Sequence, residues 1–297
     1  MAILVSNCMD RTIPRHAHPP LERSCGPSPR DWIRLTPAPD GLERMEAYFT
    51  SHAFDAHRHD TYAIGLTQAG VQRFDYRGAA RDSTAGQIIV LHPDESHNGR
   101  AGADGGFRYR MLYIAPGLIR RALGERASAL PFVAAPVADN SDLAGALTAA
   151  FDEIDRDMEG LAADQTVVAI ADALLALDPS AARHAAAAND DQAVGLARAY
   201  LDAHHDEVVA SERLEAVSGL DRYSLSRQFR RHFGTSPYRY LTMRRLDRAR
   251  ADILAGVALA DAATAAGFAD QAHMTRQFKR AYGLSPGRWR ALVRAQS

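Results

Sequence analysis

The sequence predicts an α+β chain of two domains, with a small antiparallel β-barrel and a helical hairpin first and an all-α part last. Three observations predict this fold class. Short β-type segments separated by Gly, Asp and Pro follow one another as far as residue 114. A helical period of about 3.6 residues takes over from residue 141. Near the C-terminus a segment occurs twice, which indicates a tandem helical repeat.

Length and composition are those of an ordinary globular protein. The 297 residues suffice for two domains, and the apolar and charged shares are 46% and 24%. No run approaches the roughly 18 apolar residues of a membrane span, and the start lacks the basic flank of a signal peptide. Cys8 and Cys25 both lie in the N-terminal tail, so we expect no structural disulfide. The sequence thus predicts a cytoplasmic protein without a membrane partner.

The net charge of −1 hides an asymmetry between the two parts of the chain. Residues 1–190 carry a net charge of −7, and residues 191–297 carry +6. This favours a polyanionic partner for the C-terminal part alone, and the repeat described below predicts that this partner is double-stranded DNA. A solvated basic face is the alternative.

The N-terminal part is organised around short expected strands. Proline-rich residues 1–30 are expected to form a flexible arm. We expect strands at 44–54, 62–67, 71–76, 87–91 and 107–114, with a turn at Gln68-Ala69-Gly70. The whole chain then divides into the arm, a barrel at 31–136, a hairpin at 137–178, a linker at 179–191 and a DNA-binding domain at 192–297.

Three histidines stand at the joints of the strand pattern. His57 and His59 would leave the same face of a strand, and His97 follows a turn. The arrangement resembles the cupin barrel, whose metal-binding members pair a His-x-His strand with a third His. A metal site, a polar pocket for a small molecule and plain structural histidines are all open; we favour the pocket and assign no metal and no cofactor. With the tyrosines that alternation places nearby, the expected effector-binding set is His57, His59, Tyr62, His97, Tyr109 and Tyr113.

Two amphipathic helices are expected after the barrel. Leu143, Leu147, Phe151, Ile154 and Leu161 form a stripe behind Ser141 as N-cap, and a second helix spans about 164–177. The stripe must be buried against the barrel or against a second copy of the chain. A homodimer through this hairpin is therefore expected.

The repeat near the C-terminus predicts two helix-turn-helix units. Arg-Gln-Phe occurs at 227–229 and 276–278, and Gly-x-Ser-Pro at 234–237 and 283–286. In each unit a short helix ends at a glycine, Gly219 or Gly267, and a basic reading helix follows, at 223–233 or 271–281. Pro286 is expected to stop the second unit.

Between the units, residues 237–254 form one helix of about 25 Å. This strut would place the reading helices in successive major grooves and predicts an asymmetric half-site. Their outward side chains are of the types that bond base edges and phosphates. The expected DNA-binding residues are Tyr223, Ser226, Arg227, Arg230, Gln271, His273, Thr275, Arg276 and Lys279.

The C-terminal residues also carry a family resemblance. Ala-Ala-Gly-Phe-x-Asp-Gln at 265–271, followed by Phe-Lys-Arg-x-x-Gly-x-Ser-Pro at 278–286, is similar to the DNA-binding domain of the AraC/XylS family of bacterial transcription regulators. The resemblance implies a sequence-specific regulator controlled by a small effector in the barrel, with RNA polymerase as a partner if it activates. It places base contacts on Tyr223, Ser226 and Arg227, and on Gln271, Thr275 and Arg276.

Two other functions remain open from the sequence. A metal-dependent cupin enzyme fused to a DNA-binding domain is one, and a regulator whose barrel binds no ligand is the other. We expect no enzymatic activity and name no catalytic residue.

Overall fold

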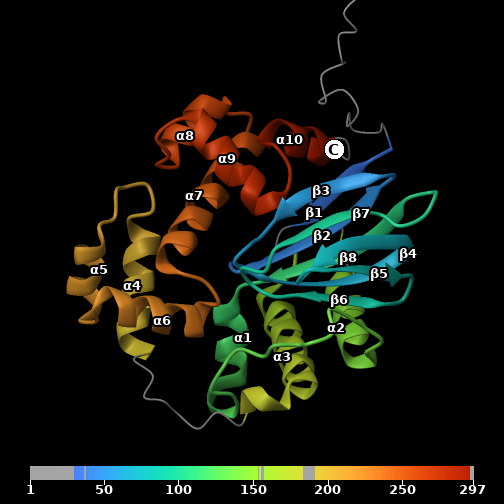
Figure 1. The fold of residues 1–297 in the computed structure, drawn as a ribbon, viewed down its shortest axis with the longest axis horizontal. Helices are drawn as coiled ribbons and strands as arrows, with labels where there is room; N and C mark the ends of the chain where they lie inside the picture. The colour runs from blue at the N-terminus through green and yellow to red at the C-terminus, as the bar shows by residue number, and fades with distance from the viewer. Residues whose placement is uncertain (1–29, 37, 153, 155–156, 183–190, 295–297) are drawn as a thin grey trace, which may run out of the picture.

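The computed structural model describes residues 30–36, 38–152, 154, 157–182 and 191–294. The N-terminal arm, including Cys8 and Cys25, and most of the expected linker lie outside the described residues. A β-barrel, three helices below it and a C-terminal set of helices beside and above it make up the fold (Figure 1). This is the α+β architecture that the sequence predicts.

All strand pairs of the barrel are antiparallel. One sheet has the order β1-β2-β8-β4-β6-β9, and β3, β5 and β7 join it through β4. Its strands are β1 (Trp32–Thr36), β2 (Leu42–Phe49), β3 (His52–His57), β4 (Tyr62–Tyr76), β5 (Ala79–Thr84), β6 (Ile88–Leu91), β7 (His97–Ala101), β8 (Phe107–Ile114) and β9 (Val137–Ala138).

The expected turn at residues 68–70 is wrong, because β4 runs through it. The first part of β4 pairs with β6 and β8, and the last part with β5 and β7, so this one strand joins both sides of the barrel. A register shift between Thr67 and Ala69 marks a β-bulge, and Gly70 has a φ of 72°. Bulges bend a strand without ending it, which is why turn-forming residues occur here inside a strand. The expected strand at 44–54 is instead two, β2 and β3.

The two faces of the sheet pack against different parts of the chain. Ile64, Val90 and Leu112 face outward, and α1 (Pro116–Leu123), α2 (Ser141–Phe151) and α3 (Gly160–Leu177) cover them. Leu143, Leu147, Phe151 and Ile154 of the expected apolar stripe are therefore buried on the barrel, whereas Leu161 lies on α3 and is exposed. Asn140, not Ser141, is the N-cap of α2, since its side chain accepts a hydrogen bond from the amide of Leu143 at 2.8 Å.

Among the described residues, α3 alone has the length and apolar composition of a possible membrane span. Its residues Ile170, Ala171 and Leu174 are buried in the core beneath the sheet. That packing accounts for the apolar residues on this face of α3.

The C-terminal helices follow the expected repeat closely. They are α4 (Asp191–Ala203), α5 (Ser211–Ser218), α6 (Arg222–Phe233), α7 (Pro237–Leu254), α8 (Leu259–Ala265), α9 (Gln271–Tyr282) and α10 (Pro286–Arg294). Helices α5 and α6 form the first unit, and α8 and α9 the second. Gly219 and Gly283 end helices in the left-handed conformation, with φ values of 72° and 68°. Pro286 was expected to stop the second unit. It is the first residue of a further helix, α10, which follows Ser285.

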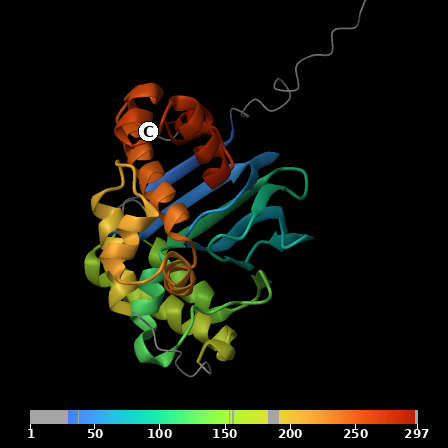
Figure 2. The ribbon, with the colours of Figure 1, turned by 60° about the vertical axis from the view of Figure 1, so that its left-hand side comes forward.

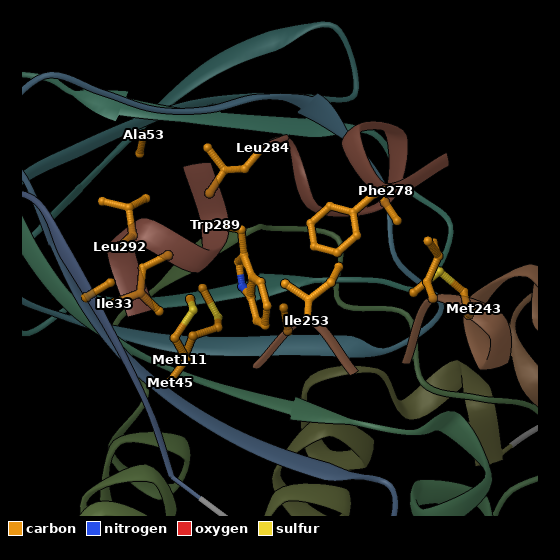
Figure 3. Packing of buried hydrophobic residues seen from close by; sticks show 14 of the residues in the cluster. Ile33, Met45, Ala53, Met111, Met243, Ile253, Phe278, Leu284, Trp289 and Leu292 are labelled. Carbon is orange, nitrogen blue, oxygen red and sulfur yellow. The ribbon is translucent and has the colours of Figure 1, made fainter. Parts of the chain in front are cut away.

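The second unit and α10 lie across one end of the barrel (Figures 1 and 2). Trp289 of α10 projects among Ile33, Met45 and Met111 of the barrel, with Ile253 and Phe278 on its other side (Figure 3). One apolar cluster therefore includes both the barrel interior and the C-terminal helices. The first unit forms a separate small core beside α4.

Candidate effector cavity and DNA-reading surface

A cavity of about 690 Å³ lies between the barrel and the C-terminal helices. The barrel contributes apolar side chains such as Met45, Ile89 and Met111. The C-terminal part contributes Met243 and Arg250 from α7, Tyr282 from α9, and Trp289 from α10. A volume of this size suits a small organic molecule, and both domains would contact it.

The three histidines singled out by the sequence meet in the wall of this cavity. His57 is the last residue of β3, His59 follows it, and His97 begins β7 as the register partner of His57. The ring centroids of His57 and His97 are 4.2 Å apart, and those of His59 and His97 are 4.9 Å apart. Burial, and then the neighbouring His59, lowers the pKa of His57 to about 3. Burial likewise lowers the pKa of His59 and of His97 well below 6.5, so all three are neutral near pH 7.

Two of the expected tyrosines line the cavity and one does not. Tyr109 and Tyr113 alternate along β8 with outward residues, and both reach the cavity. Tyr62 lies on the opposite face of the sheet, in the core below it, and its hydroxyl donates to the carbonyl of Pro131 at 2.8 Å. The alternation that puts Ala63 inside the barrel turns Tyr62 outward.

Several buried polar atoms of cavity-lining residues have no hydrogen-bond partner within the described part of the chain. They are His59 Nε2, Asp60 Oδ1, Gln72 Oε1, Arg244 Nε and Arg250 Nε. Buried polar atoms are normally bonded to protein, water or a ligand. These atoms form a polar region in the mainly apolar wall of the cavity.

Ion pairs connect the acidic barrel to the basic helix α7. Arg250 Nη2 lies 2.6 Å from Glu43 Oε2, and Arg244 Nη2 lies 3.1 Å from Asp60 Oδ2. Burial opposes the charge of Arg250, but Glu43 raises its pKa above the ordinary value. Burial raises the pKa of Asp60 to about 6 despite Arg244. Some acidic groups of the N-terminal part therefore pair with basic groups of the C-terminal part across the domain interface.

The first reading helix, α6, exposes most of the residues expected to contact DNA. Asp221 caps it by accepting from the amides of Tyr223 and Ser224, both at 3.0 Å. Tyr223, Arg227 and Arg230 are exposed, and Ser226 is half-buried. Because Tyr223 has 71% of its surface exposed, packing does not explain a large aromatic side chain there.

The second reading helix, α9, has an exposed N-terminal half and a C-terminal half docked on the barrel. Gln271 and Arg276 are exposed, and His273 and Thr275 are half-buried. At the other end, Lys279 Nζ pairs with Asp55 Oδ2 of β3 at 2.7 Å. The backbone is also tied there, since the amide of Asp55 donates to the carbonyl of Gly283 at 3.1 Å.

The sequence does not predict that the C-terminal helices form part of the cavity wall. Arg244, Arg250 and Trp289 were not expected near the barrel, because nothing local in the sequence says which domains touch. Helix α10, however, had a usable signal. Ser285-Pro286 repeats Ser236-Pro237, which opens α7, so the same N-cap and first-turn proline predict a helix after the second unit.

Comparison with known proteins agrees with this two-domain arrangement. The family described as AraC-like ligand binding domain matches residues 41–175, and a helix-turn-helix domain family matches residues 214–292. The chain belongs to the AraC family of transcriptional regulators. It has an N-terminal ligand-binding domain and a C-terminal helix-turn-helix DNA-binding domain, as the family resemblance implies.

One curated relative of this AraC-family chain comes from Bacillus subtilis (strain 168). It is YbfI, an uncharacterized HTH-type transcriptional regulator, 24% identical over 220 residues. The match covers 73% of this chain and 80% of YbfI.

Solved structures of ToxT from Vibrio cholerae share the fold. An apo structure of a ToxT point variant has a TM-score of 0.61 at 10% identity, over 86% of this chain and 99% of that one. A structure of wild-type ToxT described as bound to an unsaturated fatty acid has a TM-score of 0.57 at 9% identity, over 88% of this chain and 95% of that one. At this identity the likeness concerns the fold alone.

Proposed function

We propose that this AraC-family regulator binds its effector in the cavity between the barrel and the C-terminal helices. The observation that carries the proposal is that α7, α9 and α10 line the same cavity as the barrel strands. A ligand there contacts both the domain that senses it and the helices of the second DNA-reading unit. Its binding therefore changes the free energy of docking between the two, which is what control of DNA binding requires.

The effector that suits this cavity has an apolar body and a polar group. Met45, Ile89, Leu91 and Met111 supply the apolar wall. The proposed polar contacts are His57, His59, His97, Tyr109 and Tyr113; Tyr62 acts only by supporting the sheet from below. A fatty acid bound to ToxT, a protein of the same fold, is consistent with an amphipathic ligand of this kind.

The proposed DNA contacts keep the set derived from the sequence. The exposed N-terminal ends of α6 and α9 present base-reading candidates, namely Tyr223, Ser226, Arg227, Gln271, Thr275 and Arg276. Arg230 and His273 are proposed to contact the DNA next to these base-reading residues. Lys279 is assigned to a phosphate, and this contact requires its release from Asp55.

Further expectations concern assembly and location. We expect a cytoplasmic homodimer that contacts RNA polymerase if it activates, with arm, barrel, hairpin, linker and DNA-binding domain divided as in the sequence. On α3, Leu161 is 80% exposed and Val168 is 44% exposed. They lie seven residues apart on one helix face, which supports pairing through the hairpin. Sedimentation of the full chain tests this: a monomer at high micromolar concentration contradicts it.

We also expect binding without turnover. A ligand released by denaturing the complex should be chemically unchanged after hours of incubation. Conversion to a product would favour the enzyme alternative.

The cavity assignment can be tested by fluorescence, because Trp289 lies in the cavity wall. The chain has two tryptophans, so Trp32→Phe leaves Trp289 as the single reporter. Titration with a metabolite panel that includes fatty acids should give a saturable emission change for the effector. The same compound should alter DNA affinity.

A matched pair of variants separates cavity binding from other effects. Ala63→Phe fills the cavity and should abolish the response, whereas Ala80→Phe on the exposed strand β5 should leave it intact. An effector that alters DNA binding while Ala63→Phe binds it normally would place the site elsewhere.

A further inference from the structure

The buried rings of His57, His59 and His97 form a compact cluster in the cavity wall. One ring nitrogen from each lies within 4.8 Å of the others, and all three rings are buried. They come from the end of β3, the residues after it and the start of β7, so two paired strands hold them. The cluster is thus fixed by the barrel itself.

Each ring is held in the same tautomer. Nδ1 of His57 lies 2.8 Å from the carbonyl oxygen of Asp55, Nδ1 of His59 lies 2.9 Å from that of Thr61, and Nδ1 of His97 lies 3.0 Å from that of Glu95. A carbonyl oxygen only accepts, so each Nδ1 carries the proton. In a neutral ring the lone pair is then on Nε2.

Three Nε2 lone pairs are therefore presented within one buried cluster. Nε2 of His59 is buried and has no hydrogen-bond partner among the described residues. Metal-ligating histidines typically have this arrangement, with the other ring nitrogen donating to a carbonyl oxygen that fixes the ring.

We propose that His57, His59 and His97 bind one divalent transition-metal ion through their Nε2 atoms. Neutral imidazoles suit zinc, nickel, cobalt or iron, whereas calcium and magnesium take oxygen ligands. Three protein ligands leave at least one coordination position open. Because all three histidines line the cavity, that position is available to a carboxylate or hydroxyl group of the effector.

The metal would also act on the docking of the second DNA-reading unit. Asp55, whose carbonyl orients His57, bonds Gly283 through its amide and Lys279 through its carboxylate. The amide of Arg58 donates to the carbonyl of Arg280 at 3.0 Å. An ion that fixes the end of β3 therefore stabilises the surface on which α9 docks.

The test uses the full chain, stripped with a chelator and titrated with Zn²⁺ and Co²⁺ in the absence of effector. We expect one ion per chain by calorimetry and by elemental analysis after gel filtration, and a visible absorption band for Co²⁺. His97→Gln should weaken binding by more than the roughly 10–100-fold typical of losing an outer hydrogen-bond partner. His16 and His18 form another His-x-His pair, outside the described residues, and His16→Gln with His18→Gln is the control that should retain binding.

X-ray absorption of the zinc-loaded wild type supplies a readout that needs no variant. We expect imidazole nitrogens at about 2.0–2.1 Å from the ion. Sulfur ligands from Cys8 or Cys25, oxygen ligands alone, or binding lost in the His16/His18 control would show an adventitious ion and overturn the proposal. Absence of stoichiometric binding would overturn it as well. A Trp289 response to effector in the metal-free protein would leave the proposed regulatory function standing.

Discussion

Asp55 connects the histidine cluster of the barrel to the second helix-turn-helix unit. Its carbonyl holds the ring of His57, its amide bonds Gly283, and its carboxylate pairs with Lys279. Lys279 is the only lysine of the chain, and it belongs to the DNA-binding set expected from the sequence. In the docked arrangement that same ammonium group is paired with the barrel, so release of α9 would make it available to DNA.

We expect that replacing Arg276 reduces the ability of the protein to discriminate between DNA sequences. The Arg276 side chain is exposed on the N-terminal half of α9, where a guanidinium can bond a guanine edge. Arg276→Ala should cost about 1–3 kcal/mol at one base position. Binding to a random-sequence library, followed by sequencing, measures this. Arg81→Ala on exposed β5 is the control, and a loss spread evenly over all sequences would rule out base reading.

We expect His92 to make the free energy of unfolding depend on pH. Burial, and then Arg77, lowers its pKa to about 4, and Nε2 accepts from the amide of Val133 at 2.9 Å. Between pH 6.5 and 4 the unfolded chain binds a proton there that the folded chain does not. Stability from this residue is therefore lost on acidification, by up to about 1.4 kcal/mol per pH unit.

Urea denaturation from pH 7 to pH 5 measures this slope. Because other buried histidines titrate in the same window, the contribution of His92 is the difference between wild type and His92→Gln. The glutamine keeps an acceptor for Val133 but does not titrate. Equal slopes in the two proteins would contradict the expectation.

Among the elements, α9 shows what local sequence predicts and what it does not. Asp270 caps its start by accepting from the amide of His273 at 2.6 Å, and Gly283 ends it. Such signals are local, so its bounds follow from the sequence. That its C-terminal end contacts β3 does not follow, because the contact joins residues more than 200 positions apart.

Gly283 and Gly219 provide a matched test of this docking. Both are left-handed helix ends, so Ala costs about 1–2 kcal/mol of backbone strain at each. A Cβ on Gly219 meets nothing within 4 Å, whereas one on Gly283 lies 2.7 Å from the Asp55 carbonyl oxygen and 2.8 Å from His57 Nδ1. Gly283→Ala should therefore lose at least about 1 kcal/mol more.

Chemical denaturation and hydrogen exchange of α9 measure the difference. In Gly283→Ala, exchange should rise in α9 and β3 while the first unit stays protected. If the two variants lose equal stability, α9 does not dock on the barrel in solution.

For the whole molecule, the joint between the domains combines an apolar cluster with ion pairs. Glu43→Gln removes the carboxylate that pairs with Arg250, whose side chain is 15% exposed, and Glu43 itself is one-third exposed. The loss should fall between that of exposed and fully buried pairs, about 1–3 kcal/mol. We expect looser docking, seen as a larger radius of gyration and faster exchange in α9 and α10.

Glu125→Gln, at an exposed site, is the control for Glu43→Gln. Glu43→Gln should also weaken effector binding, because Glu43 and Arg250 both line the cavity. An unchanged radius and unchanged exchange would show that this ion pair does not hold the domains together.

The sequence by itself determined the elements and the class of the protein. The repeat and the glycine helix ends are local signals, and they located α5 to α9. The spacing of His57, His59 and His97 also indicated a site. The strands of the barrel were predicted less well, because the β-bulge between Thr67 and Ala69 contains the same residue types as a turn.

Only the tertiary structure decided where the site lies and what completes it. Trp289, Arg244 and Arg250 come to the cavity from the DNA-binding domain, and Tyr62 leaves it. Packing between distant segments depends on the summed burial of both surfaces, which no local pattern records. The same holds for the common tautomer of the three histidines, because the backbone carbonyls that set it are positioned by the folded strands.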